Sequence, residues 1–487
     1  MFIARRRPQT ATFTESIALE ALERVLPQAA IVEAARVARA PTVRRRKLPG
    51  EVTLLLCVAM SLFTSCALEV VLATMVHGLR LWWPDPDLTL ANKSAIVQAR
   101  ARLGAGPVVR LFHAVCRPLA TPETPGAFLY GLRLMAIDGT TEDVPDSPAN
   151  LRTFGRHHGD RGASAFPQVQ GVYLSECGTH AVIDAGFWPC HTSERLGAFR
   201  LLRSLGAGML LLVDRGFYSY EMVARTQATG AQVLGRVPAN VRLTPRQALP
   251  DGSYWTSIYP AERTRRQHGE HLLVRVLVYT LTDPARPGFR QTHRLRTTLL
   301  DAQAAPALDL ICAYHARWDI ELTIDELDTH QRLPRHPLRS QTPVGVIQEL
   351  YGLLVAHYAV RALMATAAAQ VPIAPTRVSF VHAVALIRVA LDDFQLVSPD
   401  QHAALYQRLL RAIAACRLPQ RAHRTNPRAV KRKMSNFALK RGSPSPSSQH
   451  LDPFATTVHI LPCSIPPAQH LNRPAPLHSV QLMLSLI

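Results

Sequence analysis

Three acidic residues in this chain have the surroundings that metal-dependent phosphoryl transfer requires. Asp138 and Asp214 each follow a short apolar run typical of a buried strand, and Glu321 lies in a helical stretch far downstream. Hard divalent cations such as Mg²⁺ prefer carboxylate oxygens, and two such cations can hold the attacking and leaving oxygens of an in-line displacement. An Asp after a strand is also ordinary turn chemistry, so either aspartate alone leaves a turn as an equal alternative. The three together, in a basic chain, favour a metal site.

The stretch around Glu321 has the pattern Tyr314-x2-Arg317-x3-Glu321. Steps of three or four residues place these side chains on one helix face, which continues to Asp328. Tyr314 and Arg317 would then contact the phosphate that the metal engages. Glu326, five residues after Glu321, lies on a different face of the helix. It is therefore not expected to replace Glu321 as a metal ligand. A solvated charged face is the equal alternative for this helix taken alone.

The charge of the chain predicts a polyanionic partner. Its 487 residues carry a formal net charge of +20, with a pI near 10.3. Such a surplus favours phosphate contacts and counterion release. Only five of the 55 basic residues are lysines, and arginine suits forked contacts with phosphate.

The cysteines and the apolar runs predict a cytoplasmic protein. The eight cysteines form no CxxC pair and show no metal-like spacing, so they are expected to be reduced thiols. No apolar segment follows the basic N-terminus, so no signal peptide is expected. The longest apolar run, residues 54–68, is too short and too polar to span a bilayer, and we expect no membrane association.

Two segments outside the acidic residues could bind DNA. Ser94 could cap a helix over 95–103 that presents Arg100 and Arg102, which is compatible with groove binding. A solvated amphipathic face is the stronger alternative for that helix taken alone. Residues 417–441 contain nine basic and no acidic residues, which indicates a mobile phosphate-binding arm that includes Lys431, Arg432 and Lys433.

Several of these segments together resemble the DDE transposases of the insertion sequence 4 type. The likeness covers roughly residues 10–441 and has no recognisable counterpart in the tail. It is carried by Ala136-Ile137-Asp138-Gly139-Thr140-Thr141, Phe166-Pro167-Gln168, Gly178-Thr179-His180, the run from Gly208 through Asp214-Arg215-Gly216-Phe217, the Tyr-Arg-Glu pattern, and Asn426-Pro427-Arg428 with the basic cluster after it.

The resemblance implies an α/β fold with a ribonuclease-H-like mixed-sheet core, a β-rich insertion, and helical N-terminal and C-terminal parts. The pattern of apolar residues, which is helical in the first and last parts and strand-like between them, agrees with this division. We expect a helical DNA-binding domain (1–125), the first part of the core (126–238), the β-rich insertion (239–303), the last part of the core with the Tyr-Arg-Glu helix (304–370), a helical region with the basic arm (371–441) and a disordered tail (442–487).

The resemblance also implies the activity, which would be to cleave DNA strands at the ends of an insertion element and to join the 3′ ends to target DNA. Asp138, Asp214 and Glu321 would hold two Mg²⁺ ions, with Mn²⁺ as a substitute, and Tyr314 and Arg317 would grip the DNA strand end. The substrates would be double-stranded DNA, namely the terminal inverted repeats of the element and target DNA. A dimer or higher oligomer would form on that DNA, in the bacterial cytoplasm at the nucleoid.

One position departs from the family pattern, which has Lys or Arg seven residues after the glutamate. Here that residue is Asp328, which on the catalytic face would repel phosphate. Two further interpretations therefore stay open: a catalytically inactive DNA-binding remnant, and another ribonuclease-H-like nuclease such as a resolvase. The β-rich insertion and the Tyr-Arg-Glu helix weigh against the resolvase.

Overall fold

The computed structural model describes most of the chain. The described residues are 24–36, 48–76, 90–159, 162–267, 269–284, 286, 288–315, 317–332, 337–418, 429–431, 438–440 and 453–463. All statements about structure below refer to these residues.

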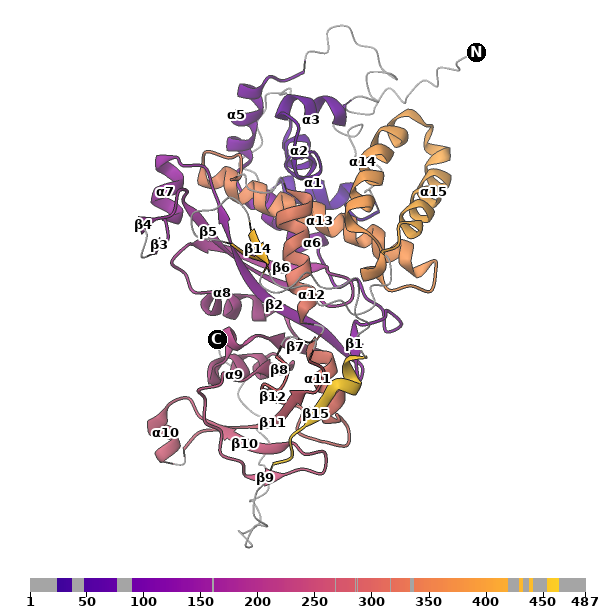
Figure 1. Cartoon of the computed structure of the whole chain (residues 1–487). Helices are drawn as coiled ribbons and strands as arrows, with labels where there is room; N and C mark the ends of the chain where they lie inside the picture. The colour runs from indigo at the N-terminus through magenta and orange to yellow at the C-terminus, as the bar shows by residue number, and fades with distance from the viewer. Residues whose placement is uncertain are drawn as a thin grey trace, which may run out of the picture.

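A mixed β-sheet forms the centre of the molecule (Figure 1). Its core strands lie in the order β6-β5-β2-β7-β8. β2 is antiparallel to β5 and β5 to β6, whereas β2, β7 and β8 are parallel. These strands are β2 (Leu132–Asp143), β5 (Gln168–Glu176), β6 (Val182–Pro189), β7 (Met209–Val213) and β8 (Gln232–Arg236). Three antiparallel strands followed by two parallel ones is the ribonuclease-H-like arrangement, so the predicted fold class is confirmed.

The β-rich insertion continues this sheet. Antiparallel strands extend it beyond β8 in the order β12-β11-β10-β9. Their bounds are β9 (Gln247–Ala248), β10 (Tyr254–Ile258), β11 (Leu272–Leu281) and β12 (His293–Thr297), with the short helix α10 (Glu262–Arg266) between β10 and β11. The core strands and the insertion therefore share one continuous hydrogen-bonded sheet.

Alternating residues of the core strands bury two different faces, as the period of a strand requires. On one face, Met135 and Ile137 pack with α8 (Glu194–Leu201) and α9 (Tyr220–Ala228). On the other, Leu134 and Ala136 belong to the large cluster that includes α11 (Ala307–His315), α12 (Trp318–Asp325) and α13 (Pro343–Ala369). Asp138 continues the second series, so its side chain faces the helix that carries Glu321.

The N-terminal helices pack on α13 rather than forming a separate body (Figure 1). They are α1 (Gln28–Arg36), α2 (Gly50–Leu62), α3 (Leu68–Met75), α5 (Lys93–Leu103) and α6 (Gly106–Val115). The apolar run of residues 54–68 lies mostly in α2 and ends at the first residue of α3. Helix α5 is capped by Asn92, which accepts from the Ala95 N–H at 2.9 Å, and not by Ser94. α13 is long and apolar enough to cross a membrane by length and composition, but most of its side chains lie inside the protein.

The predicted disordered tail contains an ordered segment. Helices α14 (Phe380–Leu396) and α15 (His402–Ala415) end the helical region, and a short pair β13 (Ala429–Lys431) and β14 (Ala438–Lys440) follows. Strand β15 (Val458–Ile460) then pairs antiparallel with β11 at the insertion (Figure 1). The prediction of disorder is therefore wrong for residues 453–463, because β11 offers backbone partners that composition does not reveal.

The remaining elements are short. They are β1 (Phe128–Leu129), α7 (Pro148–Phe154), β3 (His158–Gly159), β4 (Gly162–Ala163), the 3-10 turns η3 (Leu202–Ser204), η4 (Arg215–Phe217), η6 (Pro375–Arg377), η7 (Pro399–Gln401) and η8 (Phe454–Thr457), and the π-helix η5 (Glu326–Gln331).

Candidate active site

The sheet brings Asp138 and Asp214 side by side. β2 and β7 are parallel, with Ala136 paired to Leu212. Two residues further along this register, Asp138 stands beside Asp214, which follows the last residue of β7. Asp214 ends its strand as predicted, but Asp138 does not. β2 continues to Asp143, and Asp138 pairs with Tyr173 of β5 inside the strand. A turn at Asp138 is thereby excluded.

A glycine allows the backbone around Asp138 to be approached closely. A Cβ at Gly139 would lie 2.9 Å from the Gly171 carbonyl oxygen and 3.0 Å from Cγ of Glu194. The first distance is shorter than real Cβ contacts allow, and the second is tighter than most of them. The glycine after Asp138 therefore serves close packing within a strand, and it lets a helix residue reach the aspartate.

Arg317 joins two of the three acids. Its guanidinium donates to Oε1 of Glu321 at 2.8 Å and lies 3.8 Å from Oδ2 of Asp138. The Arg317 side chain is 8% exposed, whereas those of Asp138 and Glu321 are 23% and 40% exposed. Burial opposes the charge on Arg317, but hydrogen bonding to Glu321 and the nearby Tyr314 and Asp214 raise its pKa. The arginine thus stays cationic between the acids.

The Tyr-Arg-Glu pattern does not form one continuous helix. Tyr314 belongs to α11, which ends at His315, and Arg317 precedes the first residue of α12. The Tyr314 hydroxyl donates to the Val213 carbonyl at 3.3 Å, next to Asp214. Burial raises the pKa of Tyr314, and Asp214 adds to this effect. The predicted residues do converge, although the helix breaks between the tyrosine and the arginine.

A fourth acid, Glu194, was missed from the sequence. It is the first residue of α8, whose N-cap is Ser193, and its side chain packs against Gly139. The residue as a whole is exposed, but burial of its carboxyl group and the charge of Asp214 raise its pKa. In the sequence, Ser193-Glu194 indicates only a helix start. Its closeness to Asp214 depends on how α8 packs across the sheet.

The charge of these acids exceeds what Arg317 balances. Burial raises the pKa of Asp138 to about 6 despite the Gly139 N–H and Arg317, and Glu194 and Glu321 raise it further. The Gly139 N–H donates to Asp138 at 2.9 Å. A divalent cation would relieve this excess of negative charge, and carboxylate oxygens are the ligands that Mg²⁺ prefers. The residues therefore fit a hard divalent metal.

Comparisons with known proteins agree with this geometry. Residues 16–113 match the family model "Insertion element 4 transposase N-terminal", and residues 130–358 match "Transposase DDE domain". The transposase InsG for insertion sequence element IS4 of Escherichia coli (strain K12) is 29% identical over 396 residues, which cover 80% of this chain and 87% of that protein.

The chain belongs to the insertion sequence 4 type of DDE transposases. The putative transposase InsZ of the same organism is 28% identical over 199 residues, covering 41% of this transposase and 64% of that protein. A piggyBac transposase synaptic complex with hairpin DNA superposes with a TM-score of 0.40 and 12% identity, covering 81% of this chain and 85% of that chain.

Asp328 does not continue the helix face of Glu321 as regular α-helical spacing predicts. α12 ends at Asp325 and continues as the π-helix η5, whose wider turns rotate Asp328 away from the face of Glu321. Its Oδ1 lies 3.7 Å from Arg332, which is also paired with the buried Glu142 at the end of β2. Asp328 is thus held inside an acidic and basic cluster. The placement of Asp328 therefore gives no support to the inactive interpretation, which stays a prediction.

The predicted DNA-binding residues differ in where they lie in the structure. Arg100 is wrong for this role because it is buried, and its guanidinium donates to Gln348, Ser340 Oγ and the Gly345 carbonyl at 3.0–3.2 Å. Arg102 is exposed on the same helix. Lys431 lies in β13, whereas Arg432 and Lys433 lie outside the described residues.

Two further surfaces adjoin the acids. Trp318 is 53% exposed, and its ring lies under the Arg317 guanidinium, 5.4 Å from ring centre to Cζ. A cavity of about 730 Å³ opens between the loop after Asp214 and the insertion. Basic and aromatic residues are prominent in its lining, among them Tyr218, Tyr220, Tyr259, Arg242, Arg246 and Arg265.

Proposed function

We propose that this transposase binds the terminal inverted repeats of its own element, cleaves the strands there and joins the 3′ ends to target DNA. The observation that carries the proposal is the convergence of Asp138, Asp214 and Glu321 around one arginine. Family membership supports the general activity. The metal dependence and the roles of single residues rest on the geometry and the chemistry of the site.

Asp138, Asp214 and Glu321 would hold two Mg²⁺ ions, with Mn²⁺ as a substitute, and Glu194 stands close enough to orient or assist them. When bound, such ions activate the attacking oxygen and stabilise the leaving oxygen. Arg317 neutralises part of the acidic charge and presents the rest of its guanidinium to an incoming phosphate. Tyr314 holds the end of β7, and with it Asp214, through its hydrogen bond to Val213.

Double-stranded DNA would be bound by basic residues outside the acidic site. The net charge of +20, the exposed Arg102, the basic segment with Lys431, Arg432 and Lys433, and the cavity beside the insertion support this partner. Since transposition joins two element ends, we infer a dimer or higher oligomer on DNA. Its place of action would be the chromosome in the bacterial cytoplasm.

The test is Mg²⁺-dependent cleavage of a labelled terminal repeat. Asp138→Asn, Asp214→Asn and Glu321→Gln should each lower the cleavage rate by about 10³-fold or more, since each removes an anionic ligand. Gel-shift affinity for the same repeat should change little, because most phosphate contacts come from elsewhere. Glu221→Gln, an exposed acid on α9 paired with Arg225, is the matched control. Full cleavage by any of the three variants would remove that residue from the site.

A further inference from the structure

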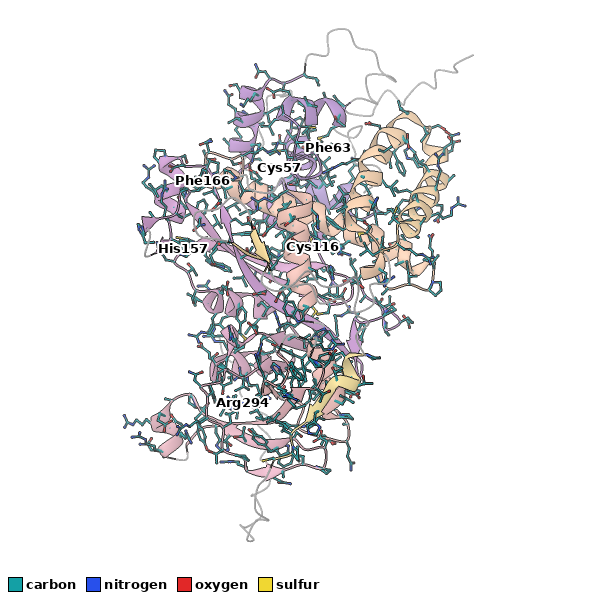
Figure 2. All side chains as sticks on the ribbon, in the orientation of Figure 1. Cys57, Phe63, Cys116, His157, Phe166 and Arg294 are labelled. Carbon is teal, nitrogen blue, oxygen red and sulfur yellow. The ribbon has the colours of Figure 1, made fainter. Side chains whose placement is uncertain are left out.

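A second group of potential metal ligands lies away from the catalytic acids. His157 comes three residues after the end of α7 and precedes the β3–β4 pair, and Cys190 and His191 follow β6 directly. Figure 2 labels His157 at the edge of the catalytic part of the molecule. The two segments are more than thirty residues apart in the chain, which is why the cysteine spacing in the sequence shows no metal site.

The ligand atoms of these three residues are close together. One nitrogen of each histidine and the Cys190 sulfur all lie within 4.8 Å of one another. The two imidazole rings meet edge to face, with centres 6.0 Å apart. In a tetrahedral zinc site, bonds of ~2.0–2.3 Å place neighbouring ligand atoms roughly 3.3–3.8 Å apart. Side-chain movements of about an ångström would therefore close the group around a cation.

The backbone holds the two segments in place. The Cys190 N–H donates to the Phe154 carbonyl at 2.8 Å, and the Gln168 N–H donates to the Gly155 carbonyl at 3.0 Å. A Cβ at Gly155, which has a φ of +75°, would lie 3.2 Å from the His191 ring and 3.4 Å from the Cys190 sulfur. The glycine thus leaves room for the ligands, and the hydrogen bonds fix the positions from which they project.

We propose that His157, Cys190 and His191 bind a zinc-class divalent cation. Two imidazoles and one thiolate form a donor set that suits Zn²⁺ and is poorly suited to Mg²⁺. Cys190 is 2% exposed and both histidines are exposed, so the ion would have sulfur on its inner side and solvent on its outer side. Water would complete four-fold coordination there.

The position of this site suggests a structural role. The cation would tie the segment before β3 to the loop between β6 and α8. Glu194, whose side chain packs against Gly139, begins α8 only three residues after His191. A bound ion would therefore hold the start of α8 against the sheet. The proposal does not depend on DNA cleavage, so its test is independent of the test of the function proposed above.

The first test uses Co²⁺ alone as a probe of the metal-free full-length chain. A thiolate ligand gives a sulfur-to-cobalt charge-transfer band that carboxylates cannot produce, so the catalytic acids do not interfere. We expect one equivalent of Co²⁺ to develop this band and Zn²⁺ to remove it. His157→Ala and His191→Ala should weaken binding by roughly tenfold or more. Both residues are exposed, so neither variant should unfold the protein.

His158→Ala is the matched control, because His158 is an exposed neighbour that is not part of the group. It should bind Co²⁺ as the wild type does. Zn²⁺ at about one hundred times its Kd should raise the unfolding temperature of the wild type and of His158→Ala by about 2–3 °C, and that of His157→Ala by less. A cobalt complex without the charge-transfer band, or one that persists unchanged in Cys190→Ser, would overturn the proposal.

Discussion

Glu321 and Glu326 lie five residues apart on one helical stretch, but their surroundings balance charge in opposite ways. Glu321 shares a single arginine with Asp138, near Asp214 and Glu194. Glu326 is surrounded by one arginine and two histidines. Arg361 donates to it from Nε at 2.9 Å, and His357 and His180 lie 3.1 and 3.2 Å away.

The pKa values follow this difference. Burial would raise the pKa of Glu326, but Arg361 and His180 hold it well below its ordinary value. Burial raises the pKa of Asp138 to about 6, and the single Arg317 does not reverse it. Both carboxyl groups are largely removed from water. The number of cations facing each carboxyl group decides whether its pKa is raised or lowered.

The two groups therefore have different tasks. The Glu326 group joins η5 to Arg361 and His357 of α13 and to His180 beside β6, so it anchors the helix that carries Glu321. The acids proposed as metal ligands keep an unbalanced negative charge, which a divalent cation would neutralise. Glu326 thus positions the helix, and Glu321 on the same stretch lies among the acids that would bind a metal.

Removing the charge of Glu326 is expected to have the largest effect on stability of the changes considered for these two groups. Glu326→Gln leaves Arg361, which is 2% exposed, without its anionic partner. Loss of one member of a buried ion pair costs about 3–5 kcal/mol. We expect the free energy of unfolding, measured by denaturant titration at pH 7, to fall by that order.

The control is Asp138→Asn without added metal, which should not destabilise the protein, because it relieves repulsion among acids. Equal losses of stability in the two variants would show that the catalytic acids are as well balanced as Glu326.

The pH dependence of Asp138 gives a smaller effect. Its folded pKa of about 6 lies above the ordinary value of 3.8, so the folded state binds more protons than the unfolded state between these values. The contribution of Asp138 is therefore present at low pH and is lost as pH rises from about 4 to 6. The loss is on the order of 1–3 kcal/mol after allowance for partial exposure.

Unfolding of the wild type and Asp138→Asn at pH 4.5 and pH 7, with and without Mg²⁺, measures this loss. In metal-free buffer the variant should gain stability relative to the wild type at pH 7. Saturating Mg²⁺ should remove that advantage by stabilising the ionised aspartate. A difference between the two proteins that is independent of both pH and Mg²⁺ would contradict the assignment of Asp138 to the metal site.

Local patterns in the sequence predicted the parts of the site that single elements determine. Strand β7 and the acid after it, the core strands, and the convergence of Tyr314, Arg317 and Glu321 follow from apolar runs and motif. Arg100 could also have been placed correctly. Ile96, Ala99 and Leu103 form the buried stripe of α5, and Arg100, four residues after Ile96, lies on that stripe.

Other parts depend on contacts between distant segments. Glu194 reaches the acids only because α8 packs on the sheet where Gly139 lacks a side chain. β15 pairs with a strand almost two hundred residues earlier, and its three residues carry no strong signal. The π-helix after Asp325 changes the face on which Asp328 lies, and regular 3.6-residue spacing cannot anticipate it. The domain boundaries themselves stay predictions.

Asp328 tests the comparison with the smallest expected effect on cleavage. Burial raises its pKa to about 8, and Glu142 adds to this against the effect of Arg332. Its stabilising contribution is thus present at low pH and is lost as pH rises from about 4 to 8. Asp328→Asn resembles the protonated acid and does not ionise in the unfolded state, so it should match the stability of the wild type near pH 4 and exceed it at pH 7 and pH 9. An acid that faced DNA would instead repel phosphate, and its removal would raise the single-turnover cleavage rate most at low salt. We expect equal rates for Asp328→Asn and the wild type at both low and high salt. Faster cleavage at low salt would return Asp328 to the catalytic face.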